Sequence, residues 1–327
     1  MSLHPGLVFL GGLVVIIVGA EVLLRGAARL AAMLGIKPIL IGMTVVAVGT
    51  SAPELAVGIA AVLEGTGSLA VANIAGTNIA NILLILGLSA AIRPLPLQLQ
   101  SLRLDVPVMI VSSVALLAMA WNGVLTRAEG AVLVLAGLAY TVALVRLSRR
   151  ESARMHREFA EEFSAKALEA GRGAGWGLWN ATVLVLGVGL TVLGAELLVP
   201  AAVELAKIFG ASDVVVGLTI VAIGTSAPEL ATTLVATVRD ERDVAVGNLI
   251  GSSIMNILVV LGLICIAAPD GVDVSRDVLW FDLPMGAAVA VACYPVFRRD
   301  RLVSRREGIA FVAVYLLYLT AVVWLRV

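Results

Sequence analysis

Segments of this 327-residue sequence repeat each other at a constant spacing of 175 positions. Residues 41–55 read IGMTVVAVGTSAPEL and residues 216–230 read VGLTIVAIGTSAPEL, with 11 of 15 positions identical. The same spacing aligns residues 70–88 with residues 245–263, of which 11 of 19 are identical, and it pairs two Gly-Ala-Glu tripeptides. A constant spacing over three segments indicates that the chain is built from two related halves.

The repeated segments lie within long apolar stretches. A helix that crosses about 30 Å of hydrocarbon needs about 20 apolar residues. Stretches of that kind lie at residues 7–24, 39–63, 69–92, 104–121, 127–147, 177–199, 214–238, 244–268, 278–297 and 307–325. Hydrophobic residues make up 60% of the chain, charged residues only 14%, and the mean hydropathy is +1.04. A water-soluble fold cannot bury that much apolar surface, so we expect an all-α integral membrane protein with ten transmembrane helices.

Each half contains five of these stretches, and because five is odd the second half must enter the membrane upside down. We therefore expect two inverted five-helix repeats, residues 1–147 and 176–327. A charged, solvated cytoplasmic loop at 148–175, which can be partly helical but is too short to form a domain, should join them. Inverted repeats are typical of secondary transporters, whose substrate sites form near the membrane midplane where the halves meet. A duplication kept only for packing would not explain polar residues repeated at membrane depth.

The distribution of basic residues predicts the orientation, because cytoplasmic loops are enriched in Lys and Arg. With the amino terminus outside, 19 of the 23 basic residues fall on the cytoplasmic side, and only Arg127, Lys207, Arg276 and Arg326 fall on the other side. We expect a multi-pass protein of the cell membrane with both termini extracytoplasmic. The first stretch lacks a basic segment ahead of it and has a counterpart in the second half, so we expect it to be a span and not a cleaved signal peptide.

The GTSAPEL segments place carboxylates near the centres of two spans. Glu54 lies in the second span and Glu229 in the seventh, where a carboxylate costs at least about 2.5 kcal/mol unless it is compensated. Pro53 and Pro228 lack an amide hydrogen, so both helices should break here. Ser51 and Glu54 also have the spacing of a capping box, as expected where a new helix begins.

Other oxygen atoms accompany the two carboxylates. The hydroxyls belong to Thr50, Ser51, Thr225 and Ser226, and the broken helices should leave carbonyls such as those of Ala47 and Ala222 facing a cavity. Hard cations prefer ligands of this kind, and calcium binds about 6 to 8 oxygen atoms. The pattern therefore predicts a cation site between spans 2 and 7.

Spans 3 and 8 add polar side chains, namely Asn73, Thr77, Asn78 and Asn81, and Asn248, Ser252, Ser253 and Asn256. Residues 77 and 81 lie one turn apart on one helical face, as do residues 252 and 256. Such side chains can also join neighbouring helices by hydrogen bonds. For Asn73 and Asn248 we leave ion binding and helix packing as equal alternatives, whereas a paired midplane acid favours a functional site.

With these motifs the chain resembles the sodium/calcium exchanger family of cation antiporters, in its prokaryotic form. The two GTSAPEL segments, followed by GTNIAN and GSSIMN, are similar to the two α-repeats of that family, and the resemblance covers nearly the whole chain. It implies ten helices, alternating access and exchange of calcium against sodium. It also implies that Glu54 and Glu229 are shared acidic ligands, flanked by the sodium or calcium ligands Thr50, Ser51, Ala47, Thr77, Thr225, Ser226, Ala222 and Ser252.

The sequence departs from the family pattern at two positions. Well-studied members carry Asp where this chain has Asn256, so both Asn81 and Asn256 are neutral here, and position 253, often Asn, is Ser. These differences bear on stoichiometry and ion preference more than on the fold. The calcium/proton branch typically has an acidic residue shortly after the Gly-Asn of spans 3 and 8, which is absent here.

Several function classes are excluded or disfavoured. The 23 basic and 23 acidic residues cancel, so no net charge favours nucleic acid, and no nucleophile–base pair or HExxH motif indicates an enzyme. A channel is disfavoured because inverted repeats around buried acids suit occlusion. A divalent cation/proton exchanger remains the alternative. We expect no resident cofactor, calcium and sodium as transported ions, lipid as the surrounding partner, and a chain that acts as a monomer. A further duplicated acid, Glu21, has Arg25 one turn away, and we interpret it as structural.

Overall fold

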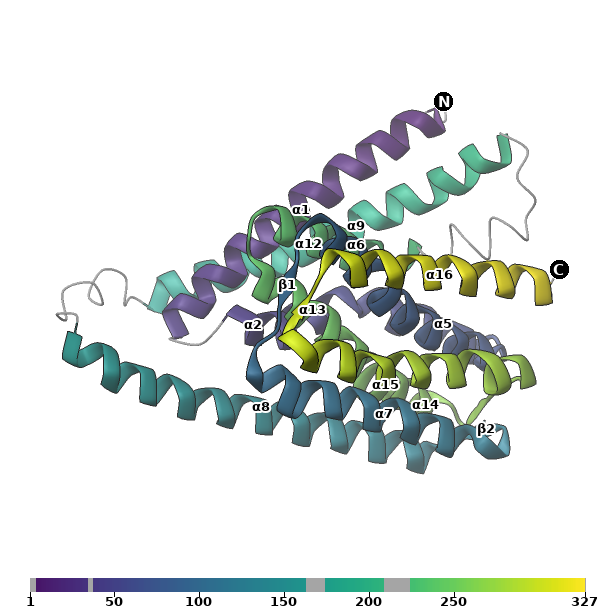
Figure 1. Cartoon of the computed structure of the whole chain (residues 1–327). Helices are drawn as coiled ribbons and strands as arrows, with labels where there is room; N and C mark the ends of the chain where they lie inside the picture. Colours follow the sequence, from purple (N-terminus) through teal and green to yellow (C-terminus); the bar gives the residue numbers. More distant parts are fainter. Residues whose placement is uncertain (1–3, 35–37, 163–173, 209–223, 327) are drawn as a thin grey trace.

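The computed structural model describes residues 4–34, 38–162, 174–208 and 224–326 (Figure 1). Within these ranges nine helical segments are long and apolar enough to cross a membrane: Pro5–Ala31, Ile39–Leu63, Gly67–Ile92, Ser101–Asn122, Arg127–Leu147, Gly177–Ile208, Arg242–Ala267, Val278–Asp300 and Arg305–Trp324. They match nine of the ten predicted spans. The remaining span, predicted at 214–238, is described only from residue 224 onward, where it contains α12 (Ala227–Val238).

The first half begins with one long helix and continues through interrupted ones. Its elements are α1 (Pro5–Leu34), α2 (Pro38–Ile41), η1 (Gly42–Val46), α3 (Ala47–Thr50), α4 (Ala52–Leu63), α5 (Gly67–Ile79), η2 (Ala80–Leu86), α6 (Gly87–Ile92), β1 (Leu95–Pro96), η3 (Ser101–Asp105), α7 (Val106–Met119), η4 (Ala120–Asn122), β2 (Val124–Leu125) and α8 (Arg127–Glu162). Segments η1, η2 and η3 are π-helical, whereas η4 is a 3₁₀ turn.

The second half follows the same order. Its elements are α9 (Ala174–Ile208), α12 (Ala227–Val238), α13 (Arg242–Met255), the π-helical η7 (Asn256–Leu261), α14 (Gly262–Ala267), β3 (Val272–Asp273), the π-helical η8 (Val278–Asp282), α15 (Leu283–Asp300), β4 (Leu302–Val303) and α16 (Arg305–Arg326). Helices α4, α5 and α6 therefore have their equivalents in α12, α13 and α14, 175 positions later.

Two short strand pairs show that the halves are inverted relative to each other. Strand β1 pairs antiparallel with β4, and β2 pairs antiparallel with β3. Because β3 is the equivalent of β1 and β4 is the equivalent of β2, one pseudo-twofold rotation exchanges the two pairs. They lie at opposite ends of the helix bundle, and both termini lie at the β2 end (Figure 1). We refer below to the β1 end and the β2 end.

An equivalent hydrogen bond in each half repeats this symmetry. The Tyr140 hydroxyl donates to Oδ1 of Asp105 at 3.0 Å, and the Tyr318 hydroxyl donates to Oδ1 of Asp282, also at 3.0 Å. Each bond joins the first turns of one span to the middle of the next span. The predicted duplication is thus present in individual contacts as well as in helix order.

Glycines allow helices α1 and α9 to pack closely against each other. A Cβ on Gly12 would lie 2.8 Å from the backbone nitrogen of Leu198, and one on Gly26 would lie 2.7 Å from that of Leu184. On α9, a Cβ on Gly187 would collide with the backbone of Leu23. Small residues allow membrane helices to approach this closely without a hydrophobic driving force.

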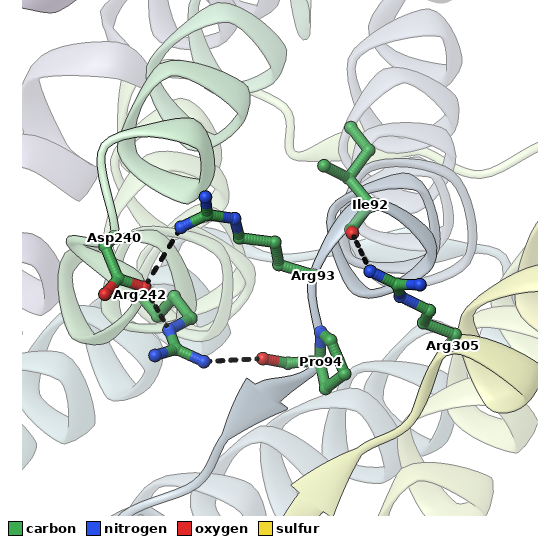
Figure 2. Close-up of polar contacts among 6 residues, drawn as sticks. All are labelled: Ile92, Arg93, Pro94, Asp240, Arg242 and Arg305. Atoms are coloured by element: carbon green, nitrogen blue, oxygen red, sulfur yellow. Dashed lines mark hydrogen bonds and ion pairs between the residues drawn. The ribbon is translucent and has the colours of Figure 1, made fainter.

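Charged contacts link the segments that meet at the β1 end (Figure 2). Arg93 and Arg242 both bind Oδ1 of Asp240, at 3.4 and 2.9 Å, and Arg242 also donates to the carbonyl of Pro94 at 3.3 Å. Arg305 donates to the carbonyl of Ile92 at 3.2 Å. The contacts of Asp240 and Arg242 tie the α12–α13 turn to the chain between α6 and β1, and the Arg305 contact ties the start of α16 to the end of α6.

Nearby at the same end, Glu21 binds Arg25 at 2.6 Å, as its spacing predicted, and it also forms an ion pair with Arg239 that the sequence did not indicate. The pair joins α1 to the end of α12. Glu21 therefore has the structural role expected of it, with one partner from each half of the chain.

Much of the segment 148–175 is helical. Helix α8 continues past the membrane span, which ends at Leu147, through Glu162. Residues 148–162 contain no Gly or Pro and are rich in Arg, Glu and Ala, which favour helices. The segment is therefore partly helical, as the sequence allowed, and residues 163–173 lie outside the described ranges.

Candidate ion-binding site

The two GTSAPEL segments break their helices in the same way. Ser51 separates α3 from α4 with φ −82° and ψ 5°, and Ser226 precedes α12 with φ −85° and ψ 9°. In both cases a Pro stands at the start of the following helix, where its missing amide hydrogen costs nothing. The predicted break in spans 2 and 7 is therefore present. It is confined to Ser51 in span 2 and to Thr225 and Ser226 in the described part of span 7.

The break places the two acids at the first turns of α4 and α12. Glu54 and Glu229 are fully buried, and they lie close enough for their charges to repel each other. The hydroxyls of Thr50 and Ser51 face the Glu229 carboxylate. None of the four carboxylate oxygens has a hydrogen-bond partner among the described residues. Acidic side chains are also favoured at the amino-terminal end of a helix by its dipole.

Eight buried side chains around this point have polar atoms without hydrogen-bond partners in the described part of the chain, and they form four symmetry-related pairs. The pairs are Ser51 and Ser226, Glu54 and Glu229, Thr77 and Ser252, and Asn81 and Asn256. Buried polar groups are nearly always paired in folded proteins. A ring of eight such side chains, four from each half, has the composition of a site whose missing partner is a cation.

Helices α5 and α13 meet on the pseudo-twofold axis. Asn78 donates its side-chain amide to the carbonyl of Ser253 at 2.9 Å, and these two positions are equivalents of each other. Asn256 donates to Oδ1 of Asn78 at 3.2 Å. Since position 253 is Ser, Asn81 has no corresponding partner, and both of its polar atoms are unpaired among the described residues. The Asn-to-Ser difference noted in the sequence thus makes the site asymmetric.

Asn81 and Asn256 lie at the start of π-helical segments, η2 and η7. A π-helical turn interrupts the regular α-helical pattern, and such turns occur frequently at functional sites. The sequence did not indicate this backbone irregularity, because no Pro or Gly stands at either position.

Thr50 and Thr225 form hydrogen bonds between the halves. The Thr50 hydroxyl has one hydrogen and three acceptors within reach, the carbonyls of Val46 and Ala47 at 3.1 and 3.3 Å and Oδ1 of Asn248 at 3.4 Å. Thr225 donates to Oδ1 of Asn73 at 3.4 Å. These direct contacts support helix packing, one of the two alternatives left open by the sequence, as the role of Asn73 and Asn248. The structure places the two threonines beside the ring of unpaired groups, with their hydroxyls already engaged.

Two predictions about the backbone break need correction. The Ala47 carbonyl is not free, because it accepts the Ser51 amide at 3.1 Å. The predicted capping box is also absent. The Ser51 hydroxyl forms no capping bond and faces Glu229 instead. Both differences arise because the chain resumes its helix after one residue. Ala222 lies outside the described residues.

Some polar residues of the region were missed by the sequence analysis. Thr232 and Thr233 on α12 are fully buried, although their equivalents in the first half are Val57 and Gly58. The signal was available in the sequence as a departure from the repeat. The described part of the chain contains no group of three or more His, Cys, Asp or Glu residues arranged so that it could hold a metal ion, so the two glutamates with hydroxyls and amides are the candidate cation ligands.

Comparison with known families identifies the architecture. The family model described as sodium/calcium exchanger protein matches residues 4–146 and 179–324, which is nearly the whole chain. The chain belongs to the sodium/calcium exchanger family. Members of this family are membrane transporters. This exchanger-family protein is therefore a cation antiporter.

Curated relatives match over almost their full length. The chain is 36% identical to a relative named CaxA, of Alkalimonas amylolytica, over 94% of this chain and 95% of the relative. It is 35% identical to inner membrane protein YrbG of Escherichia coli strain K12, over 96% and 95%, and 30% identical to sodium/calcium exchanger MaX1 of Methanosarcina acetivorans, over 98% of both.

Solved structures of the sodium-calcium exchanger NCX_Mj have the same fold. One soaked without sodium and calcium superposes with a TM-score of 0.82 at 25% identity, over 98% of this chain and 100% of the other. Another, soaked with sodium and strontium, gives 0.81 at 26% identity, over 98% and 99%. The ten-helix inverted-repeat fold predicted from the sequence is therefore confirmed.

Proposed function

We propose that this protein exchanges calcium for sodium across the membrane by alternating access, with the ions bound in turn at the ring around Glu54 and Glu229. The observation that carries the proposal is the set of eight unpaired, buried polar side chains contributed equally by the two halves. Carboxylate, hydroxyl and amide oxygens are the ligands that calcium and sodium prefer, whereas the ring contains no sulfur or imidazole.

The charge of the ring supports this pairing of ions. Two carboxylates are neutralised by one calcium or by two sodium ions, and Asn81 and Asn256 add oxygen atoms without adding charge. We assign Thr77 and Ser252 as further ligands. Thr50, Thr225 and the Ala47 carbonyl would have to exchange their present hydrogen bonds to contact an ion.

We also propose that the two halves, residues 1–147 and 176–327, function as the inverted units, with segment 148–175 between them on the cytoplasmic side. The basic residues Arg93, Arg242 and Arg305 gather at the β1 end (Figure 2), which supports a cytoplasmic β1 end under the positive-inside rule. Both termini, which share the β2 end, would then be extracytoplasmic, and a single chain supplies every proposed ligand.

A proton-coupled divalent cation exchanger is the second candidate. It is favoured by one observation, that the two buried carboxylates have no cationic partner among the described residues, since such acids can carry protons. In that mechanism Glu54 and Glu229 would release protons when the divalent ion binds.

Ion flux into liposomes containing the purified protein separates these candidates. Liposomes loaded with sodium and diluted into sodium-free medium should accumulate radioactive calcium, and monensin, which collapses the sodium gradient, should abolish the uptake. Liposomes containing a Glu54→Gln, Glu229→Gln variant serve as the matched control. Uptake that ignores monensin and stops with a protonophore would show that the counter-ion is the proton.

A further inference from the structure

Helix α12 has a row of buried hydroxyls that its counterpart α4 lacks. Thr232, Thr233 and Thr237 are each fully buried, whereas the equivalent positions in the first half are Val57, Gly58 and Val62. The row begins one turn after Glu229 and follows α12 toward the β1 end. The two halves of the chain are therefore chemically different beside the central site, because hydroxyls line α12 where apolar residues line α4.

A fourth hydroxyl lies on the neighbouring helix. In the first half, the Ile264 side chain fills the space beside α4, so that a Cβ on Gly58 would overlap it. The pseudo-twofold relation puts Ser89 of α6 at the place that corresponds to Ile264, beside Thr233, and α6 packs against α12. Ser89 is fully buried, and its hydroxyl has no hydrogen-bond partner among the described residues.

Hydrogen bonds connect this row to the central site. Thr50 donates to Asn248, and Asn248 in turn donates to the Thr233 hydroxyl at 3.3 Å. The Thr232 hydroxyl, like that of Ser89, is unpaired in the described part of the chain. Unpaired hydroxyls at full burial cost free energy, so these two are candidates for groups that are satisfied in another state of the protein.

The row leads to an acidic cavity at the β1 end. The α12–α13 turn lines a cavity of about 410 Å³ with Asp240, Glu241, Arg242 and Asp243. Arg93 and Arg242 are paired with Asp240, so Glu241 and Asp243 supply the unpaired negative charge of the cavity. Carboxylates at the mouth of a route raise the local concentration of cations. In the present conformation α1 covers α12, through apolar contacts and the Glu21–Arg239 ion pair, so the hydroxyls are shut off from the cavity.

We propose that Ser89, Thr232 and Thr233 form a second, transient cation-binding site, through which alkali and alkaline-earth ions pass between Glu229 and the acidic cavity at the β1 end. The inference rests on the proposed ion exchange. Between Glu229 and the acidic cavity no carboxylate is available to the ion. Over this stretch the hydroxyls replace part of its hydration shell. The apolar equivalents Val57, Gly58 and Ile264 provide no such site toward the β2 end.

Cysteine labelling tests the route without relying on transport. In a background with Cys265 and Cys293 replaced by Ser, Thr232→Cys should react with a charged, membrane-impermeant thiol reagent applied at the β1 face, and not with reagent applied at the β2 face. Leu135→Cys is the matched control, because Leu135 lies on the outer surface of α8 and should not react from either face. Reaction of Thr232→Cys only from the β2 face, or from neither face in protein that remains monodisperse, would overturn the route.

Flux measurements test the hydroxyls themselves. Thr232→Val should raise the apparent KM for calcium several-fold at the β1 face, and Thr232→Ser should restore it. Thr320→Val, which removes an exposed hydroxyl from α16, should change nothing. Equal loss in Thr232→Ser and Thr232→Val would overturn the role of the hydroxyl. If the unmodified protein shows no sodium-dependent calcium flux, the proposed function fails while the labelling result still decides the route.

Discussion

Asn256 donates its side-chain amide hydrogen to Oδ1 of Asn78 at 3.2 Å, while the Asn78 amide is committed to the carbonyl of Ser253 at 2.9 Å. Asn78 therefore presents an acceptor to position 256 and cannot rotate its amide without losing the bond to Ser253. A residue at position 256 has to be a donor toward Asn78, and its remaining oxygen, unpaired among the described residues, is free to bind a cation.

This geometry predicts how acidic and apolar substitutions at Asn256 differ. An Asp at position 256 can reproduce the bond only in its protonated form, so Asn256→Asp should transport calcium near neutral pH and should acquire a new pH dependence. Asn256→Leu should be far less active, because it removes an oxygen ligand and leaves the acceptor on Asn78 unpaired. Calcium uptake against pH should be compared for the three proteins in the same liposomes. Equal activity of the unmodified protein and Asn256→Leu would show that Asn256 only packs helices.

The acidic pair should be indispensable for calcium transport. Glu54→Gln or Glu229→Gln alone leaves one negative charge to compensate a doubly charged ion in a site of low dielectric constant, where the deficit is costly. Each variant should insert and fold normally, since Gln has nearly the shape of Glu, but should show calcium uptake at the level of empty liposomes. Substantial uptake by both variants would contradict the assignment.

The sequence predicted the architecture because its signals are local. Apolar stretches of membrane length and a constant spacing of 175 can be recognised without any tertiary contact, and Pro53 and Pro228 mark the breaks directly. The Ala47 carbonyl and the Ser51 hydroxyl were misjudged because a break of one residue and a break of several residues look alike in sequence. The bond between Asn78 and Asn256 joins residues from opposite halves, so only the folded structure could show it.

Close packing of α1 against α9 should be sensitive to a single methyl group. A Cβ on Gly187 would collide with the backbone of Leu23, whereas one on Gly189 would meet no atom within 4 Å. Gly187→Ala should therefore lower the melting temperature of the detergent-solubilised protein. Gly189→Ala should leave it unchanged or raise it slightly, because Ala has the higher helix propensity. Equal effects of the two substitutions would mean that the helices do not approach closely at Gly187.

The proposed orientation can be tested with two cysteines. Ser152→Cys, in the part of α8 beyond the membrane span, should react only from the cytoplasm. Gly65 lies in the turn between α4 and α5 but has φ +73°, which a side chain would strain, so the neighbouring exposed residue is the better position. Glu64→Cys should react only from outside. Reaction of both cysteines from the same side would contradict the inverted arrangement.

Glu241 should give the protein a pH-dependent stability. Its pKa is raised from 4.5, chiefly by burial and also by Glu21, while Arg239 opposes the shift. For an acid whose pKa is higher in the folded state, the stabilisation is complete below the pKa of the unfolded state, about 4.5, and is lost as the pH rises through the pKa of the folded state.

Glu241→Gln has no carboxylate to ionise, so it does not lose this stabilisation. The melting temperature of the variant minus that of the unmodified protein should therefore increase between pH 4.5 and pH 8. Thermal unfolding in detergent across this range measures it, with Glu64→Gln, which removes an exposed carboxylate, as the control. A difference that stays constant or falls as the pH rises would show that burial does not penalise the Glu241 carboxylate.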